Sequence, residues 1–197
     1  MTLLFATGNG GKLREVAALL EDKGVKVLGI NDLEDSIEVI EDGDTFVANA
    51  KKKARTLFEA TGYAVLADDS GLCVDALGGA PGVHSARYAG EAKSDEANME
   101  RLLRELSGKE GKERSAYFLC SMVFISKRGI EVDAAGRLDG EIALSRRGDK
   151  VFGYDPIFIP EGSRRTLAEY SLEEKNKISH RKRALSAILP LILPHLN

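Results

Sequence analysis

Two adjacent carboxylates follow an apolar run in VLADDSGLCVD, residues 65–75. At the mouth of a buried strand, Asp68 and Asp69 repel each other and lose hydration, which is costly unless a cation or a donor compensates. Unless their pKa values are strongly perturbed, both are ionised at pH 7 and repel a nearby triphosphate. Mg²⁺ resolves this conflict because it binds one or two carboxylates together with phosphate oxygens and water. Glu41 is a candidate second carboxylate. The alternative is a capped turn in which Asp69 only accepts backbone hydrogen bonds.

A second motif, TGNGGK at residues 7–12, lies where a strand is expected to give way to a helix. Its small residues let backbone N–H groups approach a phosphate, the helix start adds partial positive charge, and Lys12 adds a full charge. The spacing is not that of a Walker loop, GxxxxGK[ST]. A purely structural turn is the alternative.

Two further motifs contain aromatic and basic residues near the C-terminus. In FGYDP, residues 152–156, Phe152 is suited to stacking on a ring and Asp155 to accepting a ring N–H, whereas a core turn is the alternative. In the second motif, Lys175, Ser179, His180 and Arg181 offer donors for phosphate or purine carbonyl oxygens. A solvated helix face is the alternative there.

The elements that position these motifs alternate between strands and helices. A strand at residues 2–7, a helix ending by Gly24 and a strand at 25–30 predict a βαβ opening, hence an α/β architecture with ligands near the carboxyl ends of strands. An acidic stretch at residues 31–44 leads into a helix capped by Asp44 or Thr45. The next strand, at residues 63–68, is expected to end at the acid pair.

The second half of the chain predicts more strands and two final helices. A loop at residues 78–90 and a helix capped by Ser94 precede strands at 116–126, 130–138 and 141–144, so the sheet is expected to be mixed. A capping box from Ser171 to Glu174 opens one helix, and a turn followed by a helix capped by Ser179 is favoured after it. Cys73 and Cys120 lie in apolar runs, where free cysteine behaves as a small hydrophobic residue.

The bulk composition fits one globular domain over residues 1–197. With 28 basic and 31 acidic residues the net charge is −3, which gives no general attraction to nucleic acid or to an anionic membrane. The N-terminus lacks the features of a secretory signal, and no apolar stretch approaches the roughly 20 residues of a membrane span. A cytoplasmic protein without nucleic-acid or membrane partners is expected.

The motifs, taken in order, resemble a known family. TGNGGK, EDGDTFVANAKKKA, ADDSGL, GGAPGVHSARYAG, FGYDPIF and EEKNKISHR resemble the inosine triphosphate pyrophosphatases, also called dITP/XTP pyrophosphatases, over nearly the whole chain. The resemblance implies an α/β fold with a long mixed β-sheet flanked by helices, and two lobes around a central nucleotide-binding cleft. It also implies a homodimer that uses Mg²⁺ to hydrolyse ITP, dITP or XTP to the monophosphate and pyrophosphate, which removes these non-standard purine nucleotides from the pool.

The resemblance also implies roles for individual residues. Glu41 and Asp69 would hold the metal, Asp69 would accept a proton from the attacking water, and Asp68 would support them. The substrate contacts would come from Thr7, Gly8, Asn9, Gly10, Gly11, Lys12, Lys53, Ser70, Phe152, Gly153, Tyr154, Asp155, Lys175, His180 and Arg181. The chain departs from the family at Ala48, where an acid is usual, and at residues 145–151, where Arg146 and Arg147 are expected to alter the loop over the base.

Two other functions compete with this one. A nucleotide-sensing protein would keep the pocket without turnover, but Glu41 and Asp69 argue against it. An aspartyl phosphatase with a DxD nucleophile is disfavoured because positions 70 and 71 are Ser and Gly. For the leading function, selectivity follows from the base: a 6-oxo acceptor and an N1–H donor match Arg181, whereas adenine reverses both groups and leaves a buried donor unpaired.

Overall fold

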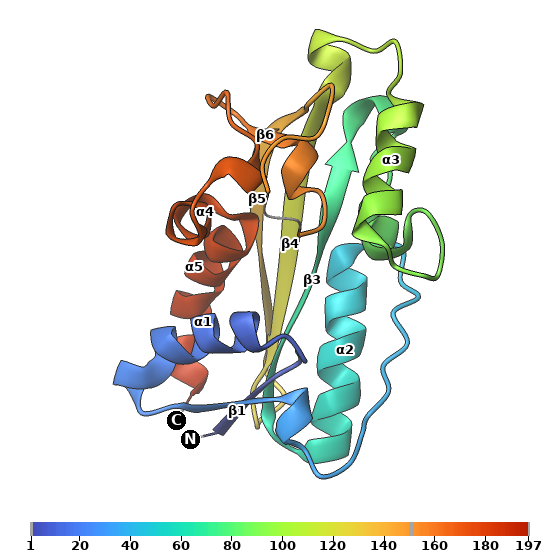
Figure 1. Cartoon of the computed structure of the whole chain (residues 1–197). Coiled ribbons are helices and arrows are strands. Elements are labelled where there is room, and N and C mark those ends of the chain that lie inside the picture. Colours follow the sequence, from blue (N-terminus) through green and yellow to red (C-terminus); the bar gives the residue numbers. More distant parts are fainter. Residues whose placement is uncertain (1, 150–151, 197) are drawn as a thin grey trace. The chain divides into compact units, whose positions relative to one another are not determined.

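The computed structural model describes residues 2–149 and 152–196, except for the side chains of Leu19 and Asp22. The strands are β1 (Thr2–Phe5), β2 (Lys26–Gly29), β3 (Ala64–Val74), β4 (Ser115–Ile125), β5 (Glu131–Ile142) and β6 (Phe158–Pro160). The α-helices are α1 (Gly10–Leu20), α2 (Phe46–Thr61), α3 (Asp95–Glu105), α4 (Leu172–Ile178) and α5 (His180–Ile192). Figure 1 shows these elements along the chain.

The strands form one mixed sheet in the order β2-β1-β3-β4-β5-β6. β1 pairs in parallel with both β2 and β3, and β5 pairs in antiparallel fashion with β6. A hydrogen bond from Ser126 N to the Ile130 carbonyl closes the turn between β4 and β5. The predicted βαβ opening and the α/β class with a mixed sheet are both confirmed.

The chain divides into two compact units. Among the described residues, unit 1 comprises 2–69, 120–136 and 184–196, and unit 2 comprises 70–119, 137–149 and 152–183. The division passes through β3, β4, β5 and α5, so each unit contains segments that are distant in sequence. The assignment of residues 1–197 to a single domain stays a prediction.

The core of unit 1 lies on both faces of its strands. On one face, Leu66 of β3 packs in a cluster with Val16 of α1 and Leu185 of α5. On the other face, Val65 and Ala67 pack in a cluster with residues of α2. Figure 1 shows α2 running beside the first half of β3, with α1 and α5 lying near each other. This alternation is the period of two expected for a strand buried on both faces.

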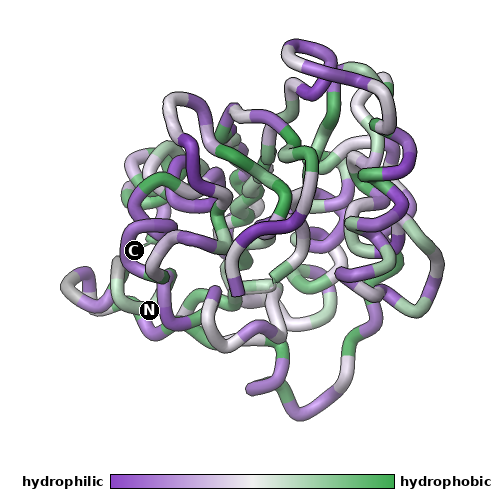
Figure 2. Tube along the Cα trace, turned by 45° about the horizontal axis from the view of Figure 1, so that its top comes forward, coloured by the Kyte–Doolittle hydropathy of each residue, from purple (hydrophilic) through white to green (hydrophobic). Residues whose placement is uncertain are grey.

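The core of unit 2 packs α3 against strand residues. Met99 and Leu102 of α3 belong to one cluster with Leu72, Phe118 and other buried residues. A buried guanidinium, that of Arg114, closes the edge of this core: it donates to the carbonyl oxygens of Ile142, Ala143, Leu106 and Lys109 at 2.6, 2.7, 3.0 and 3.3 Å. Figure 2 shows hydrophilic and hydrophobic residues mixed along the coiled segments, as expected for helices with one buried face.

Two strand predictions were wrong. β3 does not end at the acid pair but continues to Val74, because Leu72 and Val74 are buried in the core of unit 2. The strands expected at 130–138 and 141–144 are one strand, β5. Gly140 permits this continuity, since a Cβ there would lie 2.2 Å from the Ile159 carbonyl oxygen on β6.

The predicted helix ends are confirmed. Thr45, one of two candidates, caps α2 through its Oγ1, and Ser94 caps α3 in the same way. The Ser171–Glu174 capping box opens α4, and the chain breaks at Ser179 before α5 begins. Within residues 2–149 and 152–196, none of the helices combines the length and the apolar character needed to cross a bilayer.

Candidate active site

The two adjacent carboxylates point to opposite faces of β3. Asp68 lies on the face covered by α1, where Lys12 Nζ is 2.7 Å from its Oδ2. Asp69 lies on the face covered by α2, where it accepts a hydrogen bond of 3.0 Å from Asn49 Nδ2. Successive side chains of a strand alternate in this way. The expectation that the pair sits side by side at a strand mouth is therefore corrected, because each carboxylate has its own partner.

Lys12 supplies the positive charge expected opposite Asp68. The Asp68 side chain is only 1% exposed and that of Lys12 is 21% exposed. An ionised carboxylate so deeply buried needs a paired charge, because burial alone favours the neutral form. The positive charge of Lys12 therefore also stabilises the folded protein.

The Gly-rich turn is shorter than expected. α1 already begins at Gly10, and Asn9 Oδ1 accepts hydrogen bonds from the backbone N–H groups of Gly11 and Lys12 at 2.9 and 3.1 Å. Asn9 N in turn donates to Thr7 Oγ1 at 3.1 Å. Asn9 is therefore the helix cap, as its residue type favours. The turn therefore has the structural role considered as the alternative. It also lines a pocket.

A pocket of about 420 Å³ within unit 1 collects most of the residues predicted to meet the phosphates. Its lining consists of Ala6, Thr7, Gly8, Asn9, Lys12, Ile30, Ile37, Val39, Glu41, Lys53, Leu57 and Asp68. Two lysines and two carboxylates among them make the pocket highly charged. Its volume is within the range of small-molecule sites.

Lys53 of α2 connects the acid-bearing segments. Its Nζ lies 3.0 Å from Glu41 Oε2 and donates to the Asp68 carbonyl oxygen at 3.1 Å. Asn49 precedes Lys53 by one helical turn, so both side chains leave the same face of α2. Ser70, the next residue of β3, is half-buried and is the first residue of unit 2.

A second group of predicted residues gathers within unit 2. Lys175 Nζ donates to Asp155 Oδ2 and lies 4.9 Å from the centroid of the Phe152 ring. Asp155 is 5% exposed whereas Phe152 is 56% exposed, so the turn presents an open aromatic face beside a buried carboxylate. Tyr154 is buried, and its hydroxyl donates to the Ser85 carbonyl at 2.8 Å. Its side chain therefore anchors the turn in the core.

The environment of Asp155 shifts its protonation. Burial raises the pKa of the Asp155 carboxyl above its ordinary value, and the neighbouring charges of Lys175 and Arg181 counteract this only in part. Asp95 acts in the same direction as burial. The site thus holds a carboxyl group that binds a proton more readily than an exposed aspartate does.

His180 and Arg181 form the first turn of α5, as predicted. Ser179 caps the turn by accepting from Lys182 N at 3.1 Å. The His180 ring stacks on Phe118 with centroids 4.9 Å apart and an angle of 12°. Both His180 and Arg181 are half-buried, so the alternative of a solvated helix face does not hold for them.

Sequence reasoning missed two residues that support these groups. Asn49 is 2% exposed on the buried face of α2 and bonds to Asp69. Asp95 accepts a hydrogen bond of 2.7 Å from Gly153 N and so fixes the turn that carries Phe152. The sequence signal for Asn49 was its position as a polar residue on the helix face that also carries Phe46 and Ala50. Asp95 gave no signal, because an acid is common in the first turn of a helix.

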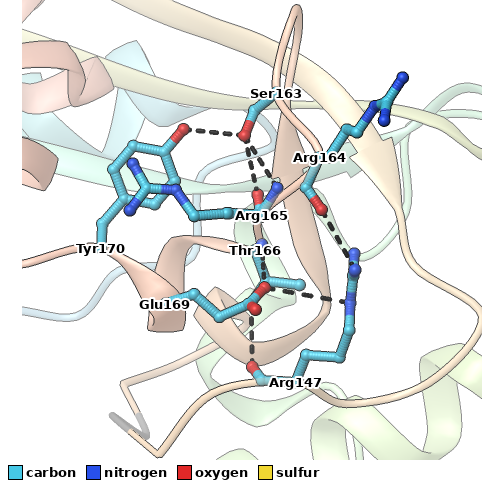
Figure 3. A network of polar contacts seen from close by, with 7 residues as sticks. All are labelled: Arg147, Ser163, Arg164, Arg165, Thr166, Glu169 and Tyr170. Atoms are coloured by element: carbon cyan, nitrogen blue, oxygen red, sulfur yellow. Dashed lines mark hydrogen bonds and ion pairs between the residues drawn. The ribbon is translucent and has the colours of Figure 1, made fainter.

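The segment expected to alter the loop over the base, which contains Arg146 and Arg147, is held in place by contacts of both arginines. Arg146 pairs with Glu96 at 2.6 Å. The Arg147 carbonyl accepts from Thr166 Oγ1 at 2.9 Å, and its guanidinium donates to the Arg164 carbonyl at 3.1 Å. Figure 3 shows the contacts of Arg147, where Glu169 also accepts from Thr166 and lies near the Arg147 guanidinium. Lys150 and Val151, the end of the segment, lie outside the described residues.

Comparisons with known proteins agree with this architecture. Residues 3–191 match the model of the Ham1 family. A Bacillus licheniformis protein named dITP/XTP pyrophosphatase is 46% identical over 96% of this chain and 97% of its own length. A Geobacter sulfurreducens protein of the same name is 50% identical over 94% of each chain. Among solved structures, the Staphylococcus aureus Ham1 protein is similar with a TM-score of 0.91, at 39% identity over 98% of both chains.

Proposed function

Because this chain belongs to the Ham1 family, we propose that it is a nucleoside triphosphate pyrophosphatase acting on the non-standard purine nucleotides ITP, dITP and XTP. The reaction breaks the bond between the α and β phosphates with water and yields the monophosphate and pyrophosphate. Its role is to remove these nucleotides from the cellular pool. The names of the similar proteins support this substrate class.

The observation that carries the proposal is the charged pocket of unit 1. It contains a helix start, Lys12 and Lys53, all of which favour an anion. Glu41 and Asp68 balance these lysines, so the pocket suits an anion that is accompanied by a cation. We assign the phosphates to this pocket and the base to the Phe152–Asp155 turn, Lys175 and the first turn of α5.

A divalent cation, which we propose to be Mg²⁺, fits the donor set. Glu41 and Asp69 would each contribute a carboxylate, and the remaining ligands that Mg²⁺ prefers are phosphate oxygens and water. When bound, the ion stabilises the negative charge that develops on the phosphates.

The chain's own residues provide the remaining chemistry. Asp69 accepts the proton of the attacking water, and its Oδ2 accepts a hydrogen bond from Asn49. Lys12 and Lys53 stabilise the phosphate oxygens. Asp68 keeps Lys12 at the pocket through their 2.7 Å contact.

Base selection falls to residues of unit 2. Phe152 is exposed enough to stack on a purine. Arg181 offers a donor to a 6-oxo group, and Asp155 offers an acceptor to N1–H. Adenine presents the opposite pattern at both positions and leaves these groups without a bond, which discriminates strongly in a buried site.

A panel of nucleoside triphosphates tests the function directly. Purified protein is incubated with ITP, dITP, XTP, GTP and ATP in Mg²⁺, and the products are separated by chromatography. We expect inosine and xanthine nucleotides to give the monophosphate and pyrophosphate, with no diphosphate. Release of diphosphate and inorganic phosphate refutes the proposed bond cleavage, and tight binding without any product indicates a nucleotide sensor instead. Excess chelator should abolish turnover.

The homodimer and the cytoplasmic location stay predictions. Sedimentation velocity of the purified protein distinguishes a monomer from a dimer. Fractionation of the source cells tests the location.

A further inference from the structure

Asn49 is a buried polar residue whose two hydrogen-bonding groups are both used. Its side chain is 2% exposed, on the face of α2 that also buries Phe46 and Ala50. The amide oxygen accepts from Gly43 N at 2.7 Å, and the amide nitrogen donates to Asp69 Oδ2 at 3.0 Å. The partners fix the orientation of the amide, since a backbone N–H only donates and a carboxylate only accepts.

The contact with Gly43 holds the segment that carries Glu41. Gly43 approaches α2 so closely that a Cβ added to it would lie 2.8 Å from Asn49 Oδ1 and 3.0 Å from Ala48 Cβ. Glu41 itself is held one helical turn further along α2, by Lys53 at 3.0 Å. One face of α2 therefore contacts the segment of Glu41, and through Asn49 it also contacts the carboxylate of Asp69.

We propose that Asn49 is a positioning residue that sets the Asp69 carboxylate and the 41–43 segment in the arrangement needed to receive the cation. This inference rests on the proposed function. A buried amide can hold two segments in register because leaving either of its groups unbonded is costly. Asn49 acts through Asp69 and through the segment that carries Glu41.

The chain offers a matched control for this role. Asn98 of α3 is also 2% exposed and also uses both ends of its amide. It accepts from Ala89 N at 2.6 Å and donates to the Ala86 carbonyl at 3.1 Å. Its partners are backbone groups of unit 2, so its loss should affect stability without touching Asp69.

The test compares Asn49→Ser with Asn98→Ser in two measurements. The first is the dissociation constant of Mn²⁺ for nucleotide-free protein, from the electron paramagnetic resonance signal of the free ion. The second is kcat and KM for dITP. We expect Asn49→Ser to weaken Mn²⁺ binding and lower kcat by about 10- to 100-fold each, the loss typical of a hydrogen bond to a charged group, with KM little changed. Asn98→Ser should leave both within about twofold of wild type while lowering the unfolding midpoint.

Equal Mn²⁺ affinity and kcat in wild type and Asn49→Ser overturn the inference, as do equal losses in Asn98→Ser. If Asn49→Ser does not fold, Gly43→Ala takes its place, because the added methyl displaces the same segment. A wild-type protein that hydrolyses none of the nucleotides refutes the proposed function, and the Mn²⁺ measurement then decides the role of Asn49 alone. Absence of Mn²⁺ binding by the wild-type protein also overturns the inference.

Discussion

Replacing Lys12 by Met should destabilise the protein substantially, because it removes the ammonium group paired with the buried Asp68 carboxylate. Asp68 is 1% exposed and the Lys12 Nζ to Asp68 Oδ2 distance is 2.7 Å. Removing one partner of a buried pair costs about 3 to 5 kcal/mol. Lys12 is partly exposed, so water can approach the carboxylate and the lower end, about 3 kcal/mol, applies. For a chain of this size that loss lowers the melting temperature by about 6 to 12 °C.

Urea unfolding and calorimetry, without nucleotide or metal, measure this effect. Lys177→Met is the matched control: Lys177 Nζ is also 2.7 Å from a carboxylate, that of Glu173, but the two side chains are 70% and 81% exposed. Its loss should leave the unfolding free energy unchanged. Asp68→Asn added to Lys12→Met should restore most of the stability, as a double-mutant cycle reveals. Equal effects of Lys12→Met and Lys177→Met refute the reasoning.

Three further predictions concern unit 2. Burial raises the pKa of Asp155 above its ordinary value of 3.8. The contribution of the protonated carboxyl to the free energy of unfolding is therefore complete below that pH and is lost as the pH rises through the raised pKa. Asp155→Asn should therefore unfold at higher urea than wild type at pH 7, and this difference should vanish in urea titrations below pH 3.8. Phe152→Ala should raise the KM for dITP by about 5- to 150-fold, the worth of one stacked base, while inhibition by pyrophosphate stays constant. Arg114→Met removes a donor from four backbone carbonyls and should cost about 3 kcal/mol in urea unfolding without changing kcat.

The helix starts could be read from the sequence because capping is local. Thr45, Ser94 and Ser179 each accept a hydrogen bond from a backbone N–H three residues ahead, so the residue type and its neighbours contain the information. The TGNGGK turn could be placed at a helix start for the same reason. Its small residues and its lysine are adjacent to the start of α1.

The extent of β3 could not be read in this way. The residues Asp68 to Gly71 favour a turn on local grounds, but buried side chains on either side keep the chain extended. The opposite orientation of the two carboxylates follows from that extension. Asn49 and Asp95 were missed because their importance lies in partners that are distant in sequence, which only the folded chain brings near.

Asp68 and Asp69 are specified by neighbouring codons, but their side chains point to opposite faces of β3. The first codon specifies the carboxylate that pairs with Lys12 of α1, and the next specifies the carboxylate that accepts a hydrogen bond from Asn49 of α2. A substitution at position 68 therefore acts first on the contacts with α1, and a substitution at position 69 acts first on the contacts with α2.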